Sequence, residues 1–167
     1  MRASPRRTTE AGPPPKRRAT LSLAIQLGDG VRELPASRPQ LRRWAAAAID
    51  QDARLTLRFV GMAEGRMLNL QYRGRDYATN VLTFAYEDLH PEGEAIEADI
   101  VICLPVLARE ARARRIALTD HLAHLLVHGV LHACGHDHEQ DDEARCMEAQ
   151  EARILARFRI ADPYLDE

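Results

Sequence analysis

Long hydrophobic runs are missing from the sequence. The longest unbroken apolar stretch, residues 100–108, spans nine positions and includes Pro105, whereas a membrane-spanning helix needs about 20 apolar residues. We therefore expect no association with a membrane. A secretory signal is not expected either, because the first residues contain no apolar segment.

Cysteine is also scarce. The chain of 167 residues contains three, Cys103, Cys134 and Cys146. An odd number in a chain of this length argues against a framework of disulfides and favours a reduced, cytoplasmic location. The length itself suits one domain with one hydrophobic core.

Lysine occurs only at position 16, so every other basic side chain is an arginine. Residues 1–18 carry six basic groups and one acidic group, which leaves 17 basic and 24 acidic groups for the remainder. Residues 19–167 are too acidic to attract nucleic acid through their net charge, so binding of nucleic acid would need a local basic patch. Arginine is well suited to such a patch, because its guanidinium can bind phosphate through two parallel hydrogen bonds.

The N-terminal segment differs in composition from the rest of the chain. Residues 1–18 are rich in proline, arginine, serine and threonine, and residues 13–15 are three successive prolines. This composition predicts a disordered basic tail, followed by a single folded domain over residues 19–167. An organelle transit peptide is the alternative, although the prolines disfavour the amphipathic helix that it requires.

In the folded part, segments whose apolar residues alternate with polar ones are interspersed with segments whose apolar residues recur at helical spacing. These two kinds of segment do not follow a strict strand–helix–strand repeat. Alternation and short apolar runs predict four strands, and helical spacing predicts five helices, the first capped by Ser37. On the helix predicted over residues 61–72, Met62, Met67, Leu68 and Leu70 are expected to face inward. We infer an α/β (α+β) domain with a small mixed sheet and a helical layer. The predicted strands lie near residues 21–26, 55–59, 81–86 and 100–103, and the helices near 37–49, 61–72, 105–115, 119–134 and 139–158.

Histidines are concentrated in one region. His128, His132 and His138 form the pattern His-x-x-x-His-x-x-Gly-x-x-His, with Gly135 as the glycine. Imidazoles four residues apart on a helix point the same way and can bind one metal ion. A glycine can end that helix in a left-handed conformation and let the chain bring back a third nitrogen. Three protein ligands leave a position open for water, as in a catalytic zinc site.

The neighbouring residues suggest supporting roles. His121 and His124 are expected to be surface residues or residues that support a ligand, and Cys134 a small buried thiol. Asp137 could orient a ligand imidazole or act on the water, and the first role is the more common one. Zinc peptidases of the metzincin type have the same histidine spacing, but their glutamate base follows the first histidine, where this chain has Gly129. Ordinary metalloproteolysis is therefore disfavoured.

Three blocks of sequence resemble the YbeY family of bacterial metal-dependent endoribonucleases. The first is the histidine block from His128 to His138. The second runs from Leu68 to Phe84 and includes Tyr72-Arg73, Asp76 and Thr79-Asn80-Val81-Leu82. The third is Asp99-Ile100-Val101-Ile102-Cys103-Leu104-Pro105. The likeness covers about residues 20–160, and Ala98 departs from it where glycine is usual.

The resemblance implies zinc, one ion per chain, bound by His128, His132 and His138. It also implies a catalytic role for Arg73. With Arg73, the candidate catalytic residues are His128 and Asp137, of which Asp137 is a candidate because it is the nearest carboxylate in sequence. The implied substrate is single-stranded RNA, especially precursor small-subunit (16S) ribosomal RNA near its 3′ end, and the implied partner is the ribosome or its small subunit. The arginines at 73 and 75, with those at 109, 112 and 115, are candidates for the basic patch.

Two other functions remain open from sequence alone. One is a ribosome assembly factor that binds the small subunit and uses its metal only for structure. The other is a different zinc hydrolase with another base. The three imidazoles also suit nickel, copper or iron, and the sequence does not predict the oligomeric state.

Overall fold

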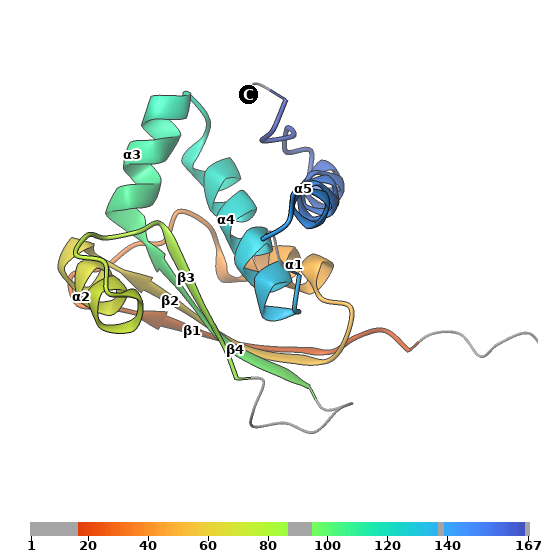
Figure 1. Cartoon of the computed structure of the whole chain (residues 1–167), viewed down its shortest axis with the longest axis horizontal. Coiled ribbons are helices and arrows are strands. Elements are labelled where there is room, and N and C mark those ends of the chain that lie inside the picture. The colour runs from red at the N-terminus through yellow and green to blue at the C-terminus, as the bar shows by residue number, and fades with distance from the viewer. Residues whose placement is uncertain (1–16, 87–94, 137–138, 166–167) are drawn as a thin grey trace, which may run out of the picture.

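A computed structural model describes residues 17–86, 95–136 and 139–165. It contains four strands and five helices within these ranges (Figure 1). The strands are β1 (Leu21–Leu27), β2 (Ala53–Val60), β3 (Val81–Ala85) and β4 (Ile96–Cys103), and the helices are α1 (Arg38–Ala48), α2 (Met62–Arg73), α3 (Leu104–Arg114), α4 (Leu118–Ala133) and α5 (Asp141–Ala156). The predicted order of strands and helices is confirmed, with shifts of a few residues at their ends.

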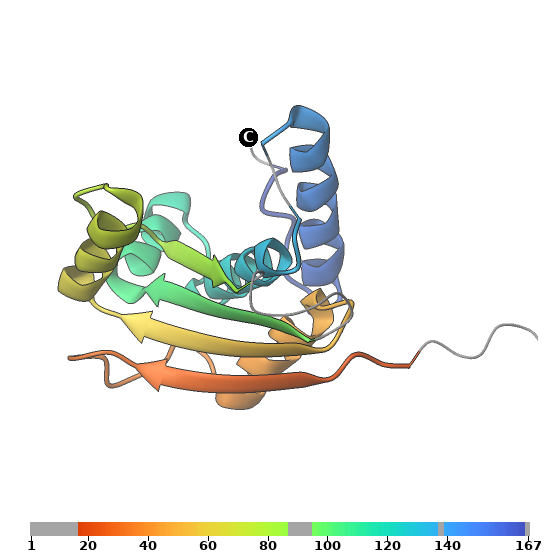
Figure 2. The ribbon, with the colours of Figure 1, turned by 60° about the horizontal axis from the view of Figure 1, so that its bottom comes forward.

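The sheet is mixed, as the sequence predicted. Its strand order is β1-β2-β4-β3. β1, β2 and β4 are parallel, and β3 is an antiparallel edge strand that pairs with β4. Figure 2 shows the four strands side by side, with α2 and α3 together at one end of the sheet and α5 at the other side. The α/β fold class is therefore confirmed.

One face of the sheet carries the main hydrophobic core. Alternate residues of β2, including Leu57 and Phe59, are fully buried on this face and belong to the same core as residues of α1 and α4. The intervening residues Arg54, Thr56 and Arg58 are not buried. This alternation is what a sheet with one main covered face requires.

Helix α1 begins as its sequence predicts. The Ser37 hydroxyl accepts a hydrogen bond from the Gln40 backbone N–H, and the Gln40 side chain accepts one from the Ser37 backbone N–H. This reciprocal capping box satisfies two backbone donors at the helix start. Leu41 and Trp44 then point into the main core.

Helix α4 is the central helix of the domain. It contacts α1, α3, α5 and the strands β3 and β4. Eleven of its 16 residues are buried, because neighbouring elements cover it on most sides. A helix this enclosed can hold its side chains in fixed positions, which a metal or catalytic site requires.

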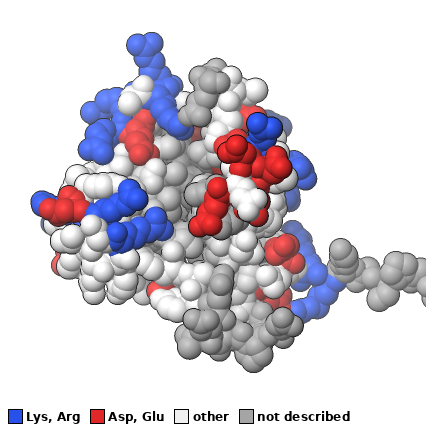
Figure 3. Space-filling view, in the orientation of Figure 1, with Lys and Arg blue, Asp and Glu red and all other residues white. Residues whose placement is uncertain are grey.

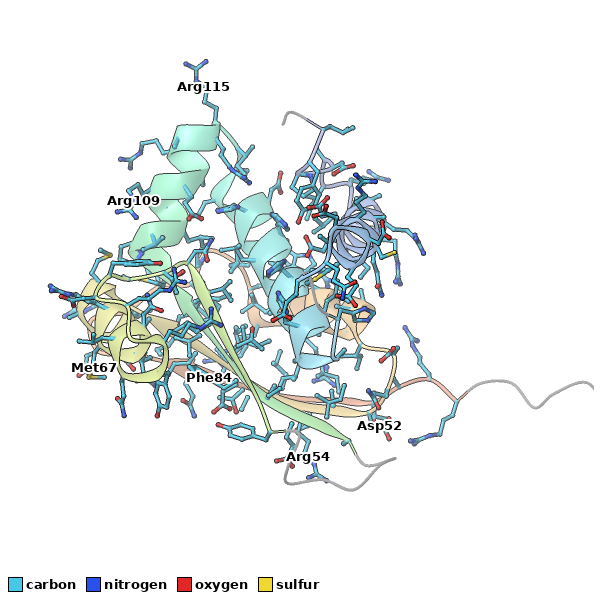
Figure 4. All side chains as sticks on the ribbon, in the orientation of Figure 1. Asp52, Arg54, Met67, Phe84, Arg109 and Arg115 are labelled. Carbon is cyan, nitrogen blue, oxygen red and sulfur yellow. The ribbon has the colours of Figure 1, made fainter. Side chains whose placement is uncertain are left out.

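The predicted inward face of α2 is wrong for three of its four residues. Met62, Met67 and Leu70 are exposed by 46%, 54% and 48%, and Leu68 is half-buried. The side of α2 that meets the protein instead contains Gly65 and Asn69. A methyl group at Gly65 would lie 3.0 Å from the Cys103 sulfur, so the helix approaches the sheet too closely for large side chains there. Figure 4 shows Met67 on the outer side of α2.

The expected tail falls almost entirely outside the described residues. Of residues 1–18, the structure describes Arg17 and Arg18, and the Arg17 guanidinium donates a hydrogen bond to the Asp52 carboxylate. Among the described residues, no helix combines the length and the apolar character needed to cross a membrane.

Candidate metal centre

Four histidines form a row along one side of α4. The ring centroids of His121 and His124 are 6.2 Å apart, those of His124 and His128 are 6.3 Å apart, and those of His128 and His132 are 4.6 Å apart. Spacings of three and four residues place side chains on the same helix face. The row therefore follows directly from the sequence.

Helix α4 ends at Ala133, directly after the last histidine of this row, as Gly135 predicts. Gly135 adopts a φ of +88°, in the left-handed region. Its N–H donates to the His132 carbonyl at 3.0 Å, and the His136 N–H donates to the Leu131 carbonyl at 3.1 Å. These two bonds form a Schellman motif, which reverses the chain direction at a helix end. His138 and Asp137, which the sequence places just after this turn, lie outside the described residues.

His128 and His132 turn the same ring atom towards each other. Their Nε2 atoms are 3.1 Å apart. Two nitrogens that bind one tetrahedral zinc ion at 2.0–2.1 Å lie about 3.3 Å from each other. The pair therefore fits a shared metal ion, and its donor set is one that zinc accepts.

Glu151 on α5 determines which nitrogen His128 presents. Its Oε1 atom accepts a hydrogen bond from His128 Nδ1 at 2.6 Å, and its side chain is fully buried. Because Nδ1 carries the proton, the lone pair of neutral His128 is on Nε2, the atom that faces His132. A carboxylate behind a histidine in this way is typical of metal sites, where it fixes the tautomer and the ring orientation.

The same carboxylate is held from its other side. Its Oε2 atom accepts a hydrogen bond from Tyr164 and lies 2.9 Å from His124 Nε2. Burial alone would raise the pKa of Glu151, but the hydrogen bonds from His124, His128 and Tyr164 outweigh it and lower the pKa to about 2. Glu151 is therefore an anion whose charge is stabilised by three donors.

These contacts also create a second possible ligand group. Among the described residues, His124, His128 and Glu151 each offer one ligand atom within 4.8 Å of the others, and together could hold a metal ion. The sequence predicted His124 to be either an exposed residue or one that supports a ligand. It is buried against Glu151, so the prediction of an exposed residue is wrong. His121 is buried as well, with an exposed fraction of 2%.

Gly129 explains why the peptidase glutamate is missing. It faces the sheet, and a methyl group at this position would lie 3.0 Å from Ile100 Cγ2 and 3.3 Å from Thr83 Oγ1. A glutamate side chain has no room there. The close packing of α4 on β3 and β4 therefore excludes a glutamate base at this position.

Arg73 occupies a different part of the surface. It is the last residue of α2, it is exposed, and Gly74 follows it with a φ of +67°. Within the described part of the chain, the residues that line the cavity beside His128 do not include Arg73. Arg75 lies close to it in sequence and donates a hydrogen bond to the Tyr77 hydroxyl.

Arginines gather on α2 and α3. Figure 3 shows basic side chains over these two helices and acidic side chains over α5. Arg109 on α3 and Arg115 directly after this helix extend into solvent (Figure 4). An acidic protein needs a local basic patch to bind nucleic acid. These arginines form such a patch on this side of the molecule.

The sequence analysis missed Glu151 and Tyr164. A signal for Glu151 was present, because Met147, Ile154 and Leu155 place apolar residues four before it and three and four after it. A glutamate within an apolar helical stripe is unusual unless it has a buried partner. No comparable pattern marks Tyr164, which lies in the segment after α5.

The fold and this centre together define a class: a small α/β protein with a histidine and carboxylate site along its central helix. Comparison with known proteins narrows the class. Residues 37–159 match the family model described as "Endoribonuclease YbeY". The chain belongs to the YbeY family.

Curated relatives support this assignment over nearly the whole length. "Endoribonuclease YbeY" of Bordetella pertussis is 57% identical over 155 residues, covering 87% of this chain and 96% of that protein. The Cupriavidus pinatubonensis protein of the same name is 50% identical over 162 residues, covering 95% of this chain and 77% of its own length. The solution structure of TM1509 from Thermotoga maritima has a TM-score of 0.51 at 23% identity, covering 82% of this chain and 91% of that one, which shows a similar fold.

Proposed function

We propose that this protein is a zinc-dependent endoribonuclease that cleaves single-stranded RNA during maturation of small-subunit ribosomal RNA, near the 3′ end. Family membership supports the endoribonuclease class. The observation that carries the metal dependence is the approach of His128 Nε2 to His132 Nε2, with His128 oriented from behind by buried Glu151. We further propose a cytoplasmic location and association with the small ribosomal subunit.

In this proposal His128, His132 and His138 hold the ion, and His124 and Glu151 support them. Both Glu151 oxygens already accept hydrogen bonds, and its side chain is fully buried. An ion that binds a substrate needs an accessible position. The Nε2 side of the His128 and His132 pair is more accessible than the Glu151 carboxylate, because the His128 side chain is 25% exposed whereas that of Glu151 is 1% exposed.

A bound zinc ion would supply an activated water and a positive charge for the phosphoryl oxygens. The protein contributes the remaining requirements. Glu151 keeps the His128 ring in one orientation, so that little reorganisation is needed when substrate binds. Arg73 and the arginines of α3 would attract and orient the phosphate backbone. Asp137, next to a proposed ligand, would orient an imidazole.

Metal content and RNA cleavage in two matched variants test this proposal. We expect wild-type protein to bind about one zinc ion, to cleave single-stranded RNA, to lose cleavage on chelation and to regain it with zinc. His132→Ala is expected to lose both zinc and cleavage. His124→Ala, which removes a supporting histidine on the same helix, is expected to retain stoichiometric zinc at saturating metal.

The opposite pattern would contradict the ligand assignment. Loss of zinc from His124→Ala together with retention by His132→Ala would place the ion in the group of His124, His128 and Glu151. A zinc-bound wild-type protein that cleaves no single-stranded RNA would contradict the nuclease function. Normal maturation of ribosomal RNA ends in cells that carry only His132→Ala would favour an assembly factor with a structural metal.

A further inference from the structure

The face of the sheet opposite the main core is covered in part by α2. This helix packs on one end of the face over a smaller apolar cluster that includes Val60, Val101 and Cys103. Between α2 and the sheet lies a groove of about 460 Å³, a volume typical of sites that bind small ligands. We call it the aromatic groove, and its lining includes Arg58, Glu64, Tyr72, Phe84, Tyr86 and Asp99.

Aromatic side chains are concentrated in this groove. The chain contains three phenylalanines, four tyrosines and one tryptophan, and three of these eight residues, Tyr72, Phe84 and Tyr86, line the groove. The rings of Tyr72 and Phe84 meet in a T-shaped contact with their centroids 5.0 Å apart. Tyr72 nevertheless remains 59% exposed and Tyr86 39% exposed. An edge contact of this kind leaves ring surface open to a further planar group.

The polar groups of the groove hold its walls in place. Arg58 Nε donates a hydrogen bond to Glu64 Oε1 at 2.7 Å, and the Tyr86 hydroxyl donates to Asp99 Oδ2 at 2.6 Å. The hydrogen bond to Asp99, together with burial, raises the pKa of Tyr86 to about 12, so this phenol is neutral. Two carboxylates beside one guanidinium disfavour a phosphate in the groove. The groove therefore suits an uncharged planar group.

Positive charge lies directly beside the groove. Arg73 follows Tyr72 in the last turn of α2 and is exposed. It belongs to the arginines that gather over α2 and α3 (Figure 3). A ligand with a neutral planar group next to an anionic group would therefore meet matching chemistry at Tyr72 and at Arg73. Each nucleotide of a single strand has this chemistry, because its base offers an open ring face and its phosphate a negative charge.

Edge strand β3 separates the aromatic groove from the helix that carries the histidines. Successive side chains of a strand point to opposite faces of a sheet. Thr83 contacts α4, with 3.5 Å between its Oγ1 atom and the Gly129 carbonyl oxygen, whereas Phe84 lines the groove (Figure 4). Because only this one edge strand lies between the groove and α4, a chain of several nucleotides is long enough to contact both.

We propose that the aromatic groove holds a base of single-stranded RNA by stacking against Tyr72, with an adjoining phosphate at Arg73. The proposal rests on the endoribonuclease function proposed above, and it assigns the choice of single strands to a surface outside the metal centre. Stacking on aromatic side chains accepts every base, because every base has a ring face. In a duplex these faces are covered by the neighbouring base pairs, so the groove selects single strands.

Titration of a labelled oligonucleotide with zinc-bound protein, followed by fluorescence anisotropy, tests the site. The oligonucleotide is single-stranded 2′-O-methyl RNA, and its integrity is checked on a gel after each titration. We expect Tyr72→Ala to weaken binding by roughly 5- to 150-fold, the range for one base stacked on an aromatic side chain. Tyr72→Phe keeps the ring and is expected to bind with nearly wild-type affinity.

A matched variant and a matched ligand serve as controls. Met67 is also a large exposed side chain of α2, with an exposed fraction of 54%, but it lies on the outer side of the helix (Figure 4). Met67→Ala is expected to retain wild-type affinity. An oligonucleotide backbone of the same length without bases separates stacking from effects of charge or folding. We expect Tyr72→Ala and wild-type protein to bind this backbone equally well.

Wild-type affinity of Tyr72→Ala for the single strand would overturn the site and favour a protein partner on this face. An equal loss of affinity for the backbone without bases would also overturn it. Should Tyr72→Ala fail to fold, the wild-type protein still decides, because equal binding of the two oligonucleotides excludes stacking. If binding depends on the Tyr72 ring but zinc-bound wild-type protein cleaves no RNA, the groove stands and the nuclease function is contradicted.

Discussion

At the scale of single residues, the buried charge of Glu151 fixes the ring orientation of His128, a proposed metal ligand. The Glu151 carboxylate accepts a hydrogen bond from His128 Nδ1, so that Nε2 is the ring atom that faces His132. It also contacts His124 and Tyr164, which hold the carboxylate in turn. Replacing Glu151 by glutamine keeps its size but removes the charge that favours a proton on His128 Nδ1.

We expect Glu151→Gln to lower zinc affinity by about 10- to 100-fold, the usual effect of losing such a supporting carboxylate. Competition with a chelator of known affinity measures the change. Glu143→Gln, an exposed substitution on the same helix, serves as the control and is expected to leave affinity unchanged. Wild-type affinity in Glu151→Gln would show that the contact does not orient a ligand.

The three cysteines provide an independent test of burial. Burial raises the pKa of Cys103, and it raises the pKa of Cys134 to about 12, whereas Cys146 is exposed on α5. Since the thiolate is the reactive form, we expect one thiol per native chain to react rapidly with a disulfide reagent at pH 8, and all three after unfolding. Rapid reaction of two or three thiols in the native protein would contradict the packing described here.

At the residue scale, prediction from sequence succeeded where spacing alone fixes geometry. The convergence of His128 and His132 follows from four residues of helix, and the turn at Gly135 from its freedom at positive φ. Glu151 lies 23 residues from His128 in sequence, so their contact depends on how α5 packs against α4. Periodicity within one helix carries no information about that packing.

At the scale of helices and strands, the close approach of α4 to the sheet sets the position of the histidine row. Gly129 permits this approach, because a methyl group there would lie 3.0 Å from Ile100 Cγ2. Ile100 is 1% exposed on β4 and has little room to move. The same packing that excludes a peptidase base therefore also positions the proposed ligands.

We expect Gly129→Ala to lower the free energy of unfolding by about 1 kcal/mol. Overpacking a core costs about 1–3 kcal/mol, and the better helix propensity of alanine returns up to about 1 kcal/mol. Chemical denaturation measures the change. Ile100→Leu removes the β-branched methyl that would clash, so the cost of Gly129→Ala should be smaller in that background. An equal cost in both backgrounds would contradict the proposed clash.

Helix α2 shows where amphipathic reasoning failed. Its apolar residues suggested an inward face, yet Met62, Met67 and Leu70 are exposed and Gly65 and Asn69 are buried. Hydrophobicity predicts burial only when a helix packs through large side chains. Here the helix packs through a glycine, and Asn69 satisfies one of its donors at the Tyr77 carbonyl at 2.7 Å. The close approach to Cys103 could not be predicted from α2 alone.

At the scale of the whole molecule, charge is divided between two sides. Arginines gather over α2 and α3, and acidic side chains over α5 (Figure 3). Overall composition predicted a need for a basic patch, and the candidate arginines named from the sequence lie on or directly after α2 and α3. That these two helices contact each other depends on packing between separate parts of the chain. The predicted mixed sheet of four strands was correct, since each strand carried a local pattern, whereas the strand order depends on contacts between distant segments.

The central claim is that three histidines, rather than the group containing Glu151, hold the catalytic ion. Anomalous scattering at the zinc absorption edge, measured on crystals of the zinc-bound protein, tests it most directly. The account predicts one strong peak within about 2.0–2.1 Å of Nε2 of His128 and Nε2 of His132, with a nitrogen of His138 as the third protein ligand. A peak bound to Glu151 and His124, with His132 turned away from it, would contradict the account.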